Sequence, residues 1–302
     1  MAGDLFIDLV MTGFPALPGL GEEGFASACH REAGGGAANT ASGLARLGLR
    51  SAVFAVAGAD SMGWMEERFS ELGVDTSLLI EHPTEPTALT VAVSTPADRI
   101  FYTYYGANAL FAELLADREQ WRRFQRARHV HFGFPVAPAL LRELAVWLHS
   151  EGIGVSIDVG WQQGWLDDPM VLAALSEVDW FLPNEHEAGR ITGEGDPRRM
   201  LAWFRRRGAR GVVLKLGAAG SAVLDGGTFC HVPAVPVDVV DTTGAGDCFN
   251  AGFLYAALSR FPMEQALRLA NFCGGLSTRA AGGIAGFPQA VEAMAARFRN
   301  ER

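Results

Sequence analysis

Residues 239–253 read Val-Val-Asp-Thr-Thr-Gly-Ala-Gly-Asp-Cys-Phe-Asn-Ala-Gly-Phe, and no other stretch says as much about the architecture. A short apolar run stops at Asp241, and two threonines and a Gly-Ala-Gly turn separate it from Asp247. Beyond the turn, apolar residues recur at steps of four and five, which places them on one helix face: Phe249, Phe253, Leu254, Ala257 and Leu258. The pattern predicts a strand, a glycine turn and a helix.

The start of this helix combines an anion site with a base. The small residues Gly244, Ala245 and Gly246 leave backbone N–H groups facing outward, where a helix has unpaired donors and a positive dipole end. Such a site binds phosphate, and the same field favours an ionised Asp247 near neutral pH. This pairing is what phosphoryl transfer to a hydroxyl requires. The simpler alternative is an Asp N-cap on an ordinary turn.

The composition restricts the class of protein. The 302 residues are 49% hydrophobic and 20% charged, as expected for a globular protein with a large core. A net charge of −9 and a pI near 5.3 argue against nucleic acid and anionic membranes as partners. Four scattered cysteines, no signal peptide and no long apolar run indicate a cytoplasmic protein with reduced thiols.

A second glycine-rich segment, residues 34–39, opens a helix predicted over residues 37–47. Its three consecutive glycines permit close approach of a ligand to the backbone, and Asn39 offers both donors and acceptors there. A flexible turn with Asn39 on a solvated face is the alternative. The G-x-G-x-x-G pattern at residues 19–24 is not a dinucleotide fingerprint, because prolines precede it and two glutamates would repel a pyrophosphate.

Most of the chain alternates between short apolar segments and helical patterns. We therefore expect an α/β fold with a mostly parallel sheet and helices on both faces. The predicted strands are residues 5–11, which carry Asp8, and residues 51–57, 129–132, 155–159, 180–182, 212–216 and 221–225. In addition to the two helices already mentioned, one helix is predicted to follow the turn at residues 58–63 and to end near residue 72. Further helices are predicted over residues 139–149, 169–176, 185–192, 198–207, 262–280 and 289–297.

A smaller sheet is predicted beside this domain. Residues 89–94 and 99–105 indicate a hairpin, and two strands alone are not stable in water. We expect the hairpin to join the irregular segment 12–32, with Gly106-Ala107-Asn108 closing the unit.

Ligands of open α/β sheets bind beyond the carboxyl ends of the strands. Asp8, Asn184 and Asp241 are expected at or near those ends. These side chains are therefore candidates for ligand contacts.

Three other groups have ordinary structural explanations. The arginines 205–207 end a helix, where the dipole favours cations. His129 and His131 share a strand face but have no third ligand close by, so a metal site is not expected. Trp161 and Trp165 are expected to pack together, with sugar stacking as the alternative.

The chain has a single lysine, Lys215, within Val-Val-Leu-Lys-Leu-Gly. A Walker A motif needs Gly-Lys-Ser/Thr, and a protein kinase needs H-R-D and D-F-G, and none of these occurs. Phosphate must therefore be held by backbone amides, arginine or a metal ion.

These motifs resemble the PfkB, or ribokinase-like, family of carbohydrate kinases. Residues 241–247 are similar to its C-terminal signature, residues 34–39 to its glycine motif, and residues 183–187 to its N-x-x-E motif. Residues 58–63 and 216–220 also fit. The five motifs occur in the family's order, which makes the resemblance specific.

The resemblance implies a ribokinase-like three-layer sandwich. A single α/β domain would span residues 1–302, with a small β-sheet lid formed by about 12–33 and 86–108. The implied activity is ATP-dependent phosphorylation of a sugar hydroxyl, with Mg²⁺ as cofactor. The implied partners are a small-molecule sugar and a second copy of the chain bound through the lid.

The resemblance also implies roles for individual residues. Asp247 would be the base, and the amides of Gly244, Ala245 and Gly246 would bind the transferred phosphoryl group. The sugar-binding residues would be Asp8, Gly34, Gly35, Asn39 and Asn108. The residues for ATP and for Mg²⁺ with its waters would be Asn184, Glu187, Lys215, Gly217, Gly220 and Asn271. In members that bind K⁺, the matching ligands are Asp241, Thr243, Thr278, Ala281 and Gly283.

Each of these residues has a simpler structural alternative. Asp241 could cap the turn, and Asn184 and Glu187 could be the N-cap and first-turn acid of a helix. Asn271 could be a solvated helix residue, and Asp8 a satisfied strand-end carboxylate.

The sequence leaves the substrate open. A phosphosugar would need cations near the lid, for which Arg31 or Arg99 could serve. A nucleoside would need an aromatic slot, for which Phe14, Phe101, Phe134 and Trp161 are available. A regulator without catalysis is a further alternative, against which the intact Gly-Ala-Gly-Asp argues.

Overall fold

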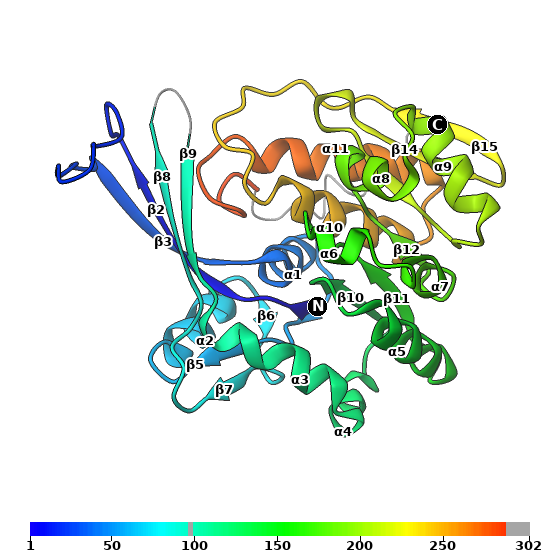
Figure 1. Cartoon of the computed structure of the whole chain (residues 1–302), viewed down its shortest axis with the longest axis horizontal. Coiled ribbons are helices and arrows are strands. Elements are labelled where there is room, and N and C mark those ends of the chain that lie inside the picture. Colours follow the sequence, from blue (N-terminus) through cyan, green and yellow to red (C-terminus); the bar gives the residue numbers. More distant parts are fainter. Residues whose placement is uncertain (96–98, 288–302) are drawn as a thin grey trace.

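The computed structural model describes residues 1–95 and 99–287, so the helix predicted over residues 289–297 lies outside the described residues. Its central sheet is mainly parallel (Figure 1). Four parallel strands form its centre, in the order β1-β10-β11-β12. They are β1 (Ala2–Gly3), β10 (His129–Gly133), β11 (Gly154–Ile157) and β12 (Trp180–Phe181).

Both edges of this sheet are extended. Parallel bridges Phe181–Val212 and Asn184–Lys215 join β12 to an antiparallel group: β13 (Val213–Lys215), β14 (Ser221–Asp225) and β15 (Thr228–Val232). At the other edge, Ala2 bridges to Phe54, beside two short parallel pairs. These are β4 (Ser51–Ala52) with β6 (Val74–Asp75) and β5 (Val56–Gly58) with β7 (Ile80–His82).

Helices cover both faces of the sheet, as predicted. One face carries α1 (Gly36–Arg46), α2 (Met62–Glu71), α10 (Ala245–Leu258) and α11 (Met263–Ser277). The other carries α3 (Phe111–Ala116), α4 (Arg118–Trp121), α5 (Pro138–Ser150), α6 (Gln163–Leu166), α7 (Val171–Leu175), α8 (Glu185–Thr192) and α9 (Pro197–Arg206). Strand alternation explains the two cores, because Val213 packs toward α10 and α11 while Leu214 packs on the opposite face. No helix in the described part of the chain combines the length and apolar character needed to cross a bilayer.

A separate four-stranded sheet, here called the small sheet, projects from the body at the left of Figure 1. Its order is β3-β2-β8-β9: β3 (Ala28–Gly34), β2 (Phe6–Thr12), β8 (Leu89–Ser94) and β9 (Arg99–Tyr104). β2 pairs with β8 in parallel, and the other two pairs are antiparallel.

The structure corrects three expectations about strands. The main sheet takes only Ala2–Gly3 at the N-terminus, so Asp8 lies within β2 of the small sheet and not at the end of a main-sheet strand. The segment 12–32, expected to be irregular, contains most of β3. The apolar run before Asp241 is not a strand, because it follows the edge strand β15 and its valines are exposed, Val239 by 60% and Val240 by 66%.

Candidate active site

Asp247 lies in the first turn of α10, and the turn before it depends on glycine. Gly244 has φ 71°, and a Cβ on this residue would lie 2.6 Å from the Cα atom of Gly283. The amide of Ala245 donates to the carbonyl of Thr242 at 3.2 Å, so it is engaged within the turn. Among the described residues, the amides of Gly246 and Asp247 have no acceptor, as expected for a helix start that can receive an anion.

The carboxylate of Asp247 lies half-buried between α10 and α1. Asn39 donates from Nδ2 to its Oδ2 at 3.0 Å, and Oδ1 lies 3.4 Å from the position that a Cβ on Gly36 would take. Burial raises the pKa of Asp247 to about 6, although the Asn39 hydrogen bond acts in the opposite direction. Burial therefore outweighs the helix field expected from the sequence, yet the carboxylate is still mostly ionised at pH 7.

Asp8 reaches the same region from the small sheet. A Cβ on Gly34 would lie 1.9 Å from Oδ2 of Asp8, so only glycine at position 34 leaves room for this carboxylate. Burial, then the charges of Asp247, Glu32 and Asp241, raises the pKa of Asp8 to about 6. Asp8 is thus close enough to Asp247 for the two charges to interact.

The glycine motif brings Asn39 to this site, while Asn108 is placed differently from the expectation. Gly35 has φ 100°, and its backbone packs against the carbonyl of Asp4. Asn108 is 1% exposed, and its side-chain amide bonds both backbone groups of Leu5 at 3.1 Å. Asn108 therefore holds the chain where it enters the small sheet and does not face the carboxylates.

Lys215 forms a buried ion cluster on the other side of the Gly-Ala-Gly turn. Its Nζ lies 2.5 Å from Oδ2 of Asp158, and Asn250 donates to the same oxygen at 2.6 Å. Burial works against both charges, but their attraction outweighs it, so the pKa of Asp158 falls and that of Lys215 rises. A Cβ on Gly246 would lie 3.4 Å from Nζ, so the ammonium lies against the turn.

Sequence reasoning missed Asp158 and Asn250. The available signals were an aspartate that ends the apolar strand β11 and an asparagine three residues after Asp247 on α10. Neither signal was specific, because polar residues often occur at strand ends and near helix starts.

Asn184 and Glu187 form a capping box at the start of α8. The Asn184 side chain accepts from the Glu187 amide at 2.9 Å, and Oε2 of Glu187 accepts from the Asn184 amide at 2.9 Å. Glu187 is 2% exposed, and burial followed by the charge of Asp158 raises its pKa. Asn184 and Glu187 therefore do act as the N-cap and first-turn acid of α8, as the structural alternative proposed. Two of about four acceptor positions on the carboxylate remain for metal-bound water.

A cavity of about 490 Å³ adjoins the turn. Its walls are mainly apolar and small, and its lining includes Lys215, Gly217, Gly220, Val237, Gly246 and Phe249. Asn271 also lines it, and its Nδ2 donates to the carbonyls of Val232 and Pro233 at 3.0 and 3.1 Å. At 6% exposure, Asn271 is not the solvated helix residue considered as an alternative.

The oxygens expected to bind K⁺ are already engaged by protein donors. Asp241 accepts from the amide of Thr243 at 2.9 Å and from the amide of Gly282 at 3.0 Å. The carbonyl of Thr278 accepts from the amides of Val240 and Asp241 at 2.7 and 3.0 Å. These bonds order the segment around Asp241, and K⁺ binding there stays a prediction.

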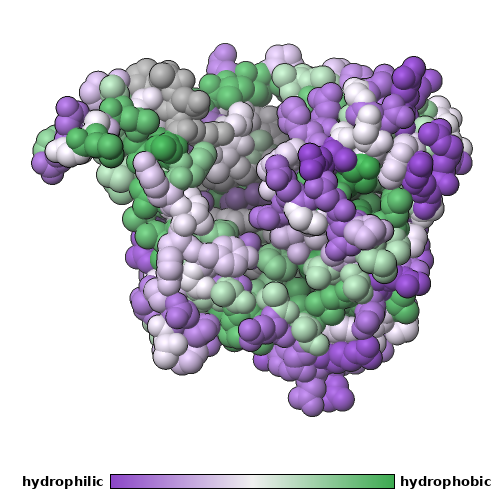
Figure 2. Space-filling model, in the orientation of Figure 1, coloured by the Kyte–Doolittle hydropathy of each residue, from purple (hydrophilic) through white to green (hydrophobic). Residues whose placement is uncertain are grey.

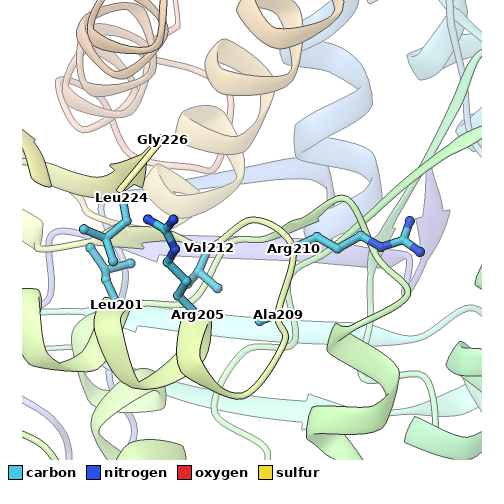
Figure 3. A pocket seen from close by; sticks show the side chains of 7 residues that line it. All are labelled: Leu201, Arg205, Ala209, Arg210, Val212, Leu224 and Gly226. Carbon is cyan, nitrogen blue, oxygen red and sulfur yellow. The ribbon is translucent and has the colours of Figure 1, made fainter. Parts of the chain in front are cut away.

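Several other groups lie apart from this site. Trp165 packs against Phe181, whereas Trp161 is 53% exposed, so the expected tryptophan pair does not form. His129 and His131 both bond the hydroxyl of Ser156. A second cavity of about 230 Å³ lies between α9 and β14, with Arg205 beside it and Arg210 pointing away (Figure 3).

Comparison with known proteins identifies the family of the chain. The model of the pfkB family of carbohydrate kinases matches residues 19–290. A 2-dehydro-3-deoxygluconokinase of Bacillus subtilis is 30% identical over 270 residues, or 84% of this chain and 83% of that protein.

Two solved structures have the same fold. Arabidopsis thaliana ribokinase complexed with ribose and ATP has a TM-score of 0.82 at 25% identity, covering 100% of this chain and 98% of that one. An E. coli protein in complex with ATP and Mg²⁺ has a TM-score of 0.82 at 23% identity, covering 98% and 97%.

Proposed function

The chain belongs to the pfkB family of carbohydrate kinases, and on this premise we propose that it transfers the γ-phosphoryl group of ATP to a hydroxyl of a small sugar, with Asp247 as the base. The observation that supports this most directly is the position of the Asp247 carboxylate. It lies beside the unpaired amides of its own helix start, between Asp8 on one side and the 490 Å³ cavity on the other.

In this proposal the nucleotide occupies the cavity. Its apolar walls, including Val237 and Phe249, would enclose the base, and the phosphates would extend toward Lys215 and Gly246. Mg²⁺, when bound, would neutralise charge on the phosphate oxygens. The residues suited to hold it through water are Glu187 and Asp158, because both carboxylates are close to the phosphate end of the cavity and to Lys215.

The sugar would bind on the other side of Asp247. Asp8 would accept hydrogen bonds from two neighbouring hydroxyls, and Asn39 would contribute its side-chain oxygen. The small sheet would act as a lid that excludes water from the reacting hydroxyl. Figure 2 shows the surface hollowed between this sheet and the body.

The chemical step then follows from these positions. The sugar hydroxyl oxygen attacks the γ-phosphorus, and its proton passes to the carboxylate of Asp247. The bond from the γ-phosphorus to the bridging oxygen breaks, which releases ADP. The amides of Gly246 and Asp247 stabilise the charge on the transferred group, together with the ammonium of Lys215.

We also propose that the chain forms a homodimer through the outer face of the small sheet. Strand pairing places Met11, Val91, Val93 and Tyr102 on that face, beyond Leu9, which packs against the body. Tyr102 is 61% exposed, and an apolar strand face of this kind is stable in water when a second copy covers it.

The proposed chemistry is tested by Asp247→Asn in an ADP-release assay with a sugar panel. Loss of a positioned base costs about 10²–10⁴-fold in rate, so kcat should fall by at least that much while the Kd of ATP is unchanged. Near-normal turnover in this variant would exclude Asp247 as the base. If the unmodified protein releases no ADP with any sugar, the kinase function itself is contradicted.

A further inference from the structure

The polar groups of the proposed sugar site are almost all acceptors. Asp8 and Asp247 present carboxylate oxygens, and Oδ1 of Asn39 is buried without a hydrogen-bond partner among the described residues. One of the two hydrogens on Nδ2 of Asn39 is already used, because Nδ2 donates to Asp247. A site lined by acceptors requires a ligand that donates hydrogen bonds, as hydroxyl groups do.

Three basic side chains near this site already have acceptors. Arg68 bonds Glu32 at 2.6 Å and Glu71 at 2.8 Å. Arg46 donates to the carbonyls of Ile284 and Phe287 at the far end of α1. Lys215 is paired with Asp158 on the nucleotide side of the turn.

Arg31, considered above as a phosphosugar ligand, faces away from the site. It pairs with Leu9 across β2 and β3, whereas Asp8 pairs with Glu32, so the two pairs lie on opposite faces of the small sheet. Its guanidinium lies 3.9 Å from the ring centroid of Trp64. Arg31 therefore stacks on α2 and does not pair with Asp8.

The start of α1 is a further positive element, and a carboxylate already occupies it. Gly36 opens this helix, and Oδ1 of Asp247 lies 3.4 Å from where a Cβ on Gly36 would be. The helix field thus stabilises the base. The pKa of Asp8 is raised first by burial and then by the charges of Asp247, Glu32 and Asp241, all in the same direction.

From these contacts we propose that the sugar site accepts an uncharged polyol and discriminates against sugars that carry a carboxylate or a phosphate. This inference rests on the proposed kinase function and specifies the substrate class of the same site. It separates this chain from the B. subtilis relative, because 2-dehydro-3-deoxygluconate is an acid. An anionic group would add repulsion where a hydroxyl would find an acceptor.

The experiment compares matched pairs of sugars in the ADP-release assay. Each pair has the same carbon skeleton and differs in one charged group: a hexose with its 6-phosphate, and an aldose with its aldonate. In the pair that the protein phosphorylates faster, we expect kcat/KM to be at least about tenfold higher for the neutral sugar than for the anionic one. A higher kcat/KM for the anionic member would overturn the inference and leave the kinase function standing.

Ionic strength gives a second readout. In a negatively charged site, salt screens the repulsion, so the KM of an anionic sugar should fall between about 20 and 300 mM NaCl while that of a neutral sugar stays constant. A KM that rises with salt would mean that a cation binds the anionic group. If Arg99→Ala then removed that dependence, a cation at the tip of β9 would be responsible and the inference would be wrong.

Glu32→Gln tests the charges directly, with Glu71→Gln as the matched control. Both glutamates bond Arg68, but only Glu32 lies on the face of Asp8. Glu32→Gln should raise kcat/KM for anionic relative to neutral sugars by about tenfold, and Glu71→Gln should leave the ratio within about twofold. Equal ratios in both variants would contradict the inference. If the protein phosphorylates neither neutral nor anionic sugars, both the kinase function and the inference are contradicted.

Discussion

The side-chain amide of Asn39 donates to Oδ2 of Asp247 at 3.0 Å, although 208 residues separate the two along the chain. This bond joins the first turn of α1 to the first turn of α10. The same helix starts carry the two glycine motifs, so each motif supplies part of one site. The bond also stabilises the ionised form of Asp247, because its donor faces a carboxylate oxygen.

Asn39→Ala should therefore shift the acid limb of the kcat–pH profile upward. Losing the donor raises the pKa of Asp247 above its value of about 6, so activity should decline at a higher pH, by about half to one unit. Thr40→Val is the control, because the Thr40 hydroxyl bonds the backbone carbonyl of Asp247 and not its carboxylate. An unchanged acid limb in Asn39→Ala would contradict the prediction.

Asp247→Asn should raise thermal stability at neutral pH. The pKa of Asp247 is about 6 in the folded protein against 3.8 for an unperturbed aspartate, so the fold binds its proton more tightly than the unfolded chain does. The free energy of unfolding therefore decreases as pH rises from about 4 to about 6, because Asp247 loses its proton in the folded protein. Above about pH 6 the whole of this destabilisation remains. The variant should melt a few degrees higher at about pH 7.5, and the gain should disappear near pH 4. A lower melting temperature than that of the unmodified protein at neutral pH would argue against a desolvated carboxylate.

Gly244→Ala should abolish turnover, whereas Gly193→Ala should not. Both glycines have φ 71°, so the substitution imposes similar backbone strain at each. A Cβ at position 244 would meet Gly283 at 2.6 Å, while position 193 has open space within 4 Å. Displacement of the turn should lower kcat by at least about 100-fold. Equal losses of activity in the two variants would indicate strain alone, and melting curves would separate folding from function.

Lys215→Met should destabilise the fold through the carboxylate that it leaves behind. Asp158, 11% exposed, would keep only Asn250 as a partner, and breaking a buried pair costs about 3–5 kcal/mol. Lys215→Met/Asp158→Asn should regain a large part of that free energy in urea unfolding without regaining activity. If the double variant were no more stable than Lys215→Met, the unpaired charge would not be the cause.

Tyr102→Asp should convert the proposed dimer to a monomer. The substitution places a charge on the apolar face of the small sheet, within its edge strand β9, where a partner would have to bury it. Val146→Asp on α5 is the control, since Val146 is also apolar and 51% exposed. Sedimentation at several concentrations measures the outcome, and a dimer that survives Tyr102→Asp would place the interface elsewhere.

The layered fold could be predicted because its signals are local. Apolar strands alternate with amphipathic helices, and helices such as α5 and α9 begin and end close to the predicted residues. The N-terminal strand could not be divided correctly, because its apolar residues serve two sheets in turn. Only pairing distinguishes Ala2–Gly3, beside β10, from Phe6–Thr12, beside β3 and β8.

The candidate site was partly predictable for a related reason. Asp247 and the glycines of both motifs need special backbone geometry, which leaves a pattern in the sequence. Asp158 and Asn250 need only a place beside Lys215, and that proximity comes from tertiary packing. Asn108 shows the limit of a resemblance, which implied a sugar contact, whereas the structure shows its amide bonded to Leu5.

The lone ammonium side chain has a practical consequence for labelling. Lys215 is the only lysine among the 302 residues, and it is 13% exposed in its ion pair with Asp158. Amine-directed dyes and coupling resins therefore have no lysine on the outer surface to modify, and the one they could reach borders the nucleotide cavity. The exposed thiol of Cys29 pairs with Met11 on the proposed dimer face, so a label there would report on dimer formation. An acyl-phosphate probe would report on nucleotide occupancy through a single labelled peptide.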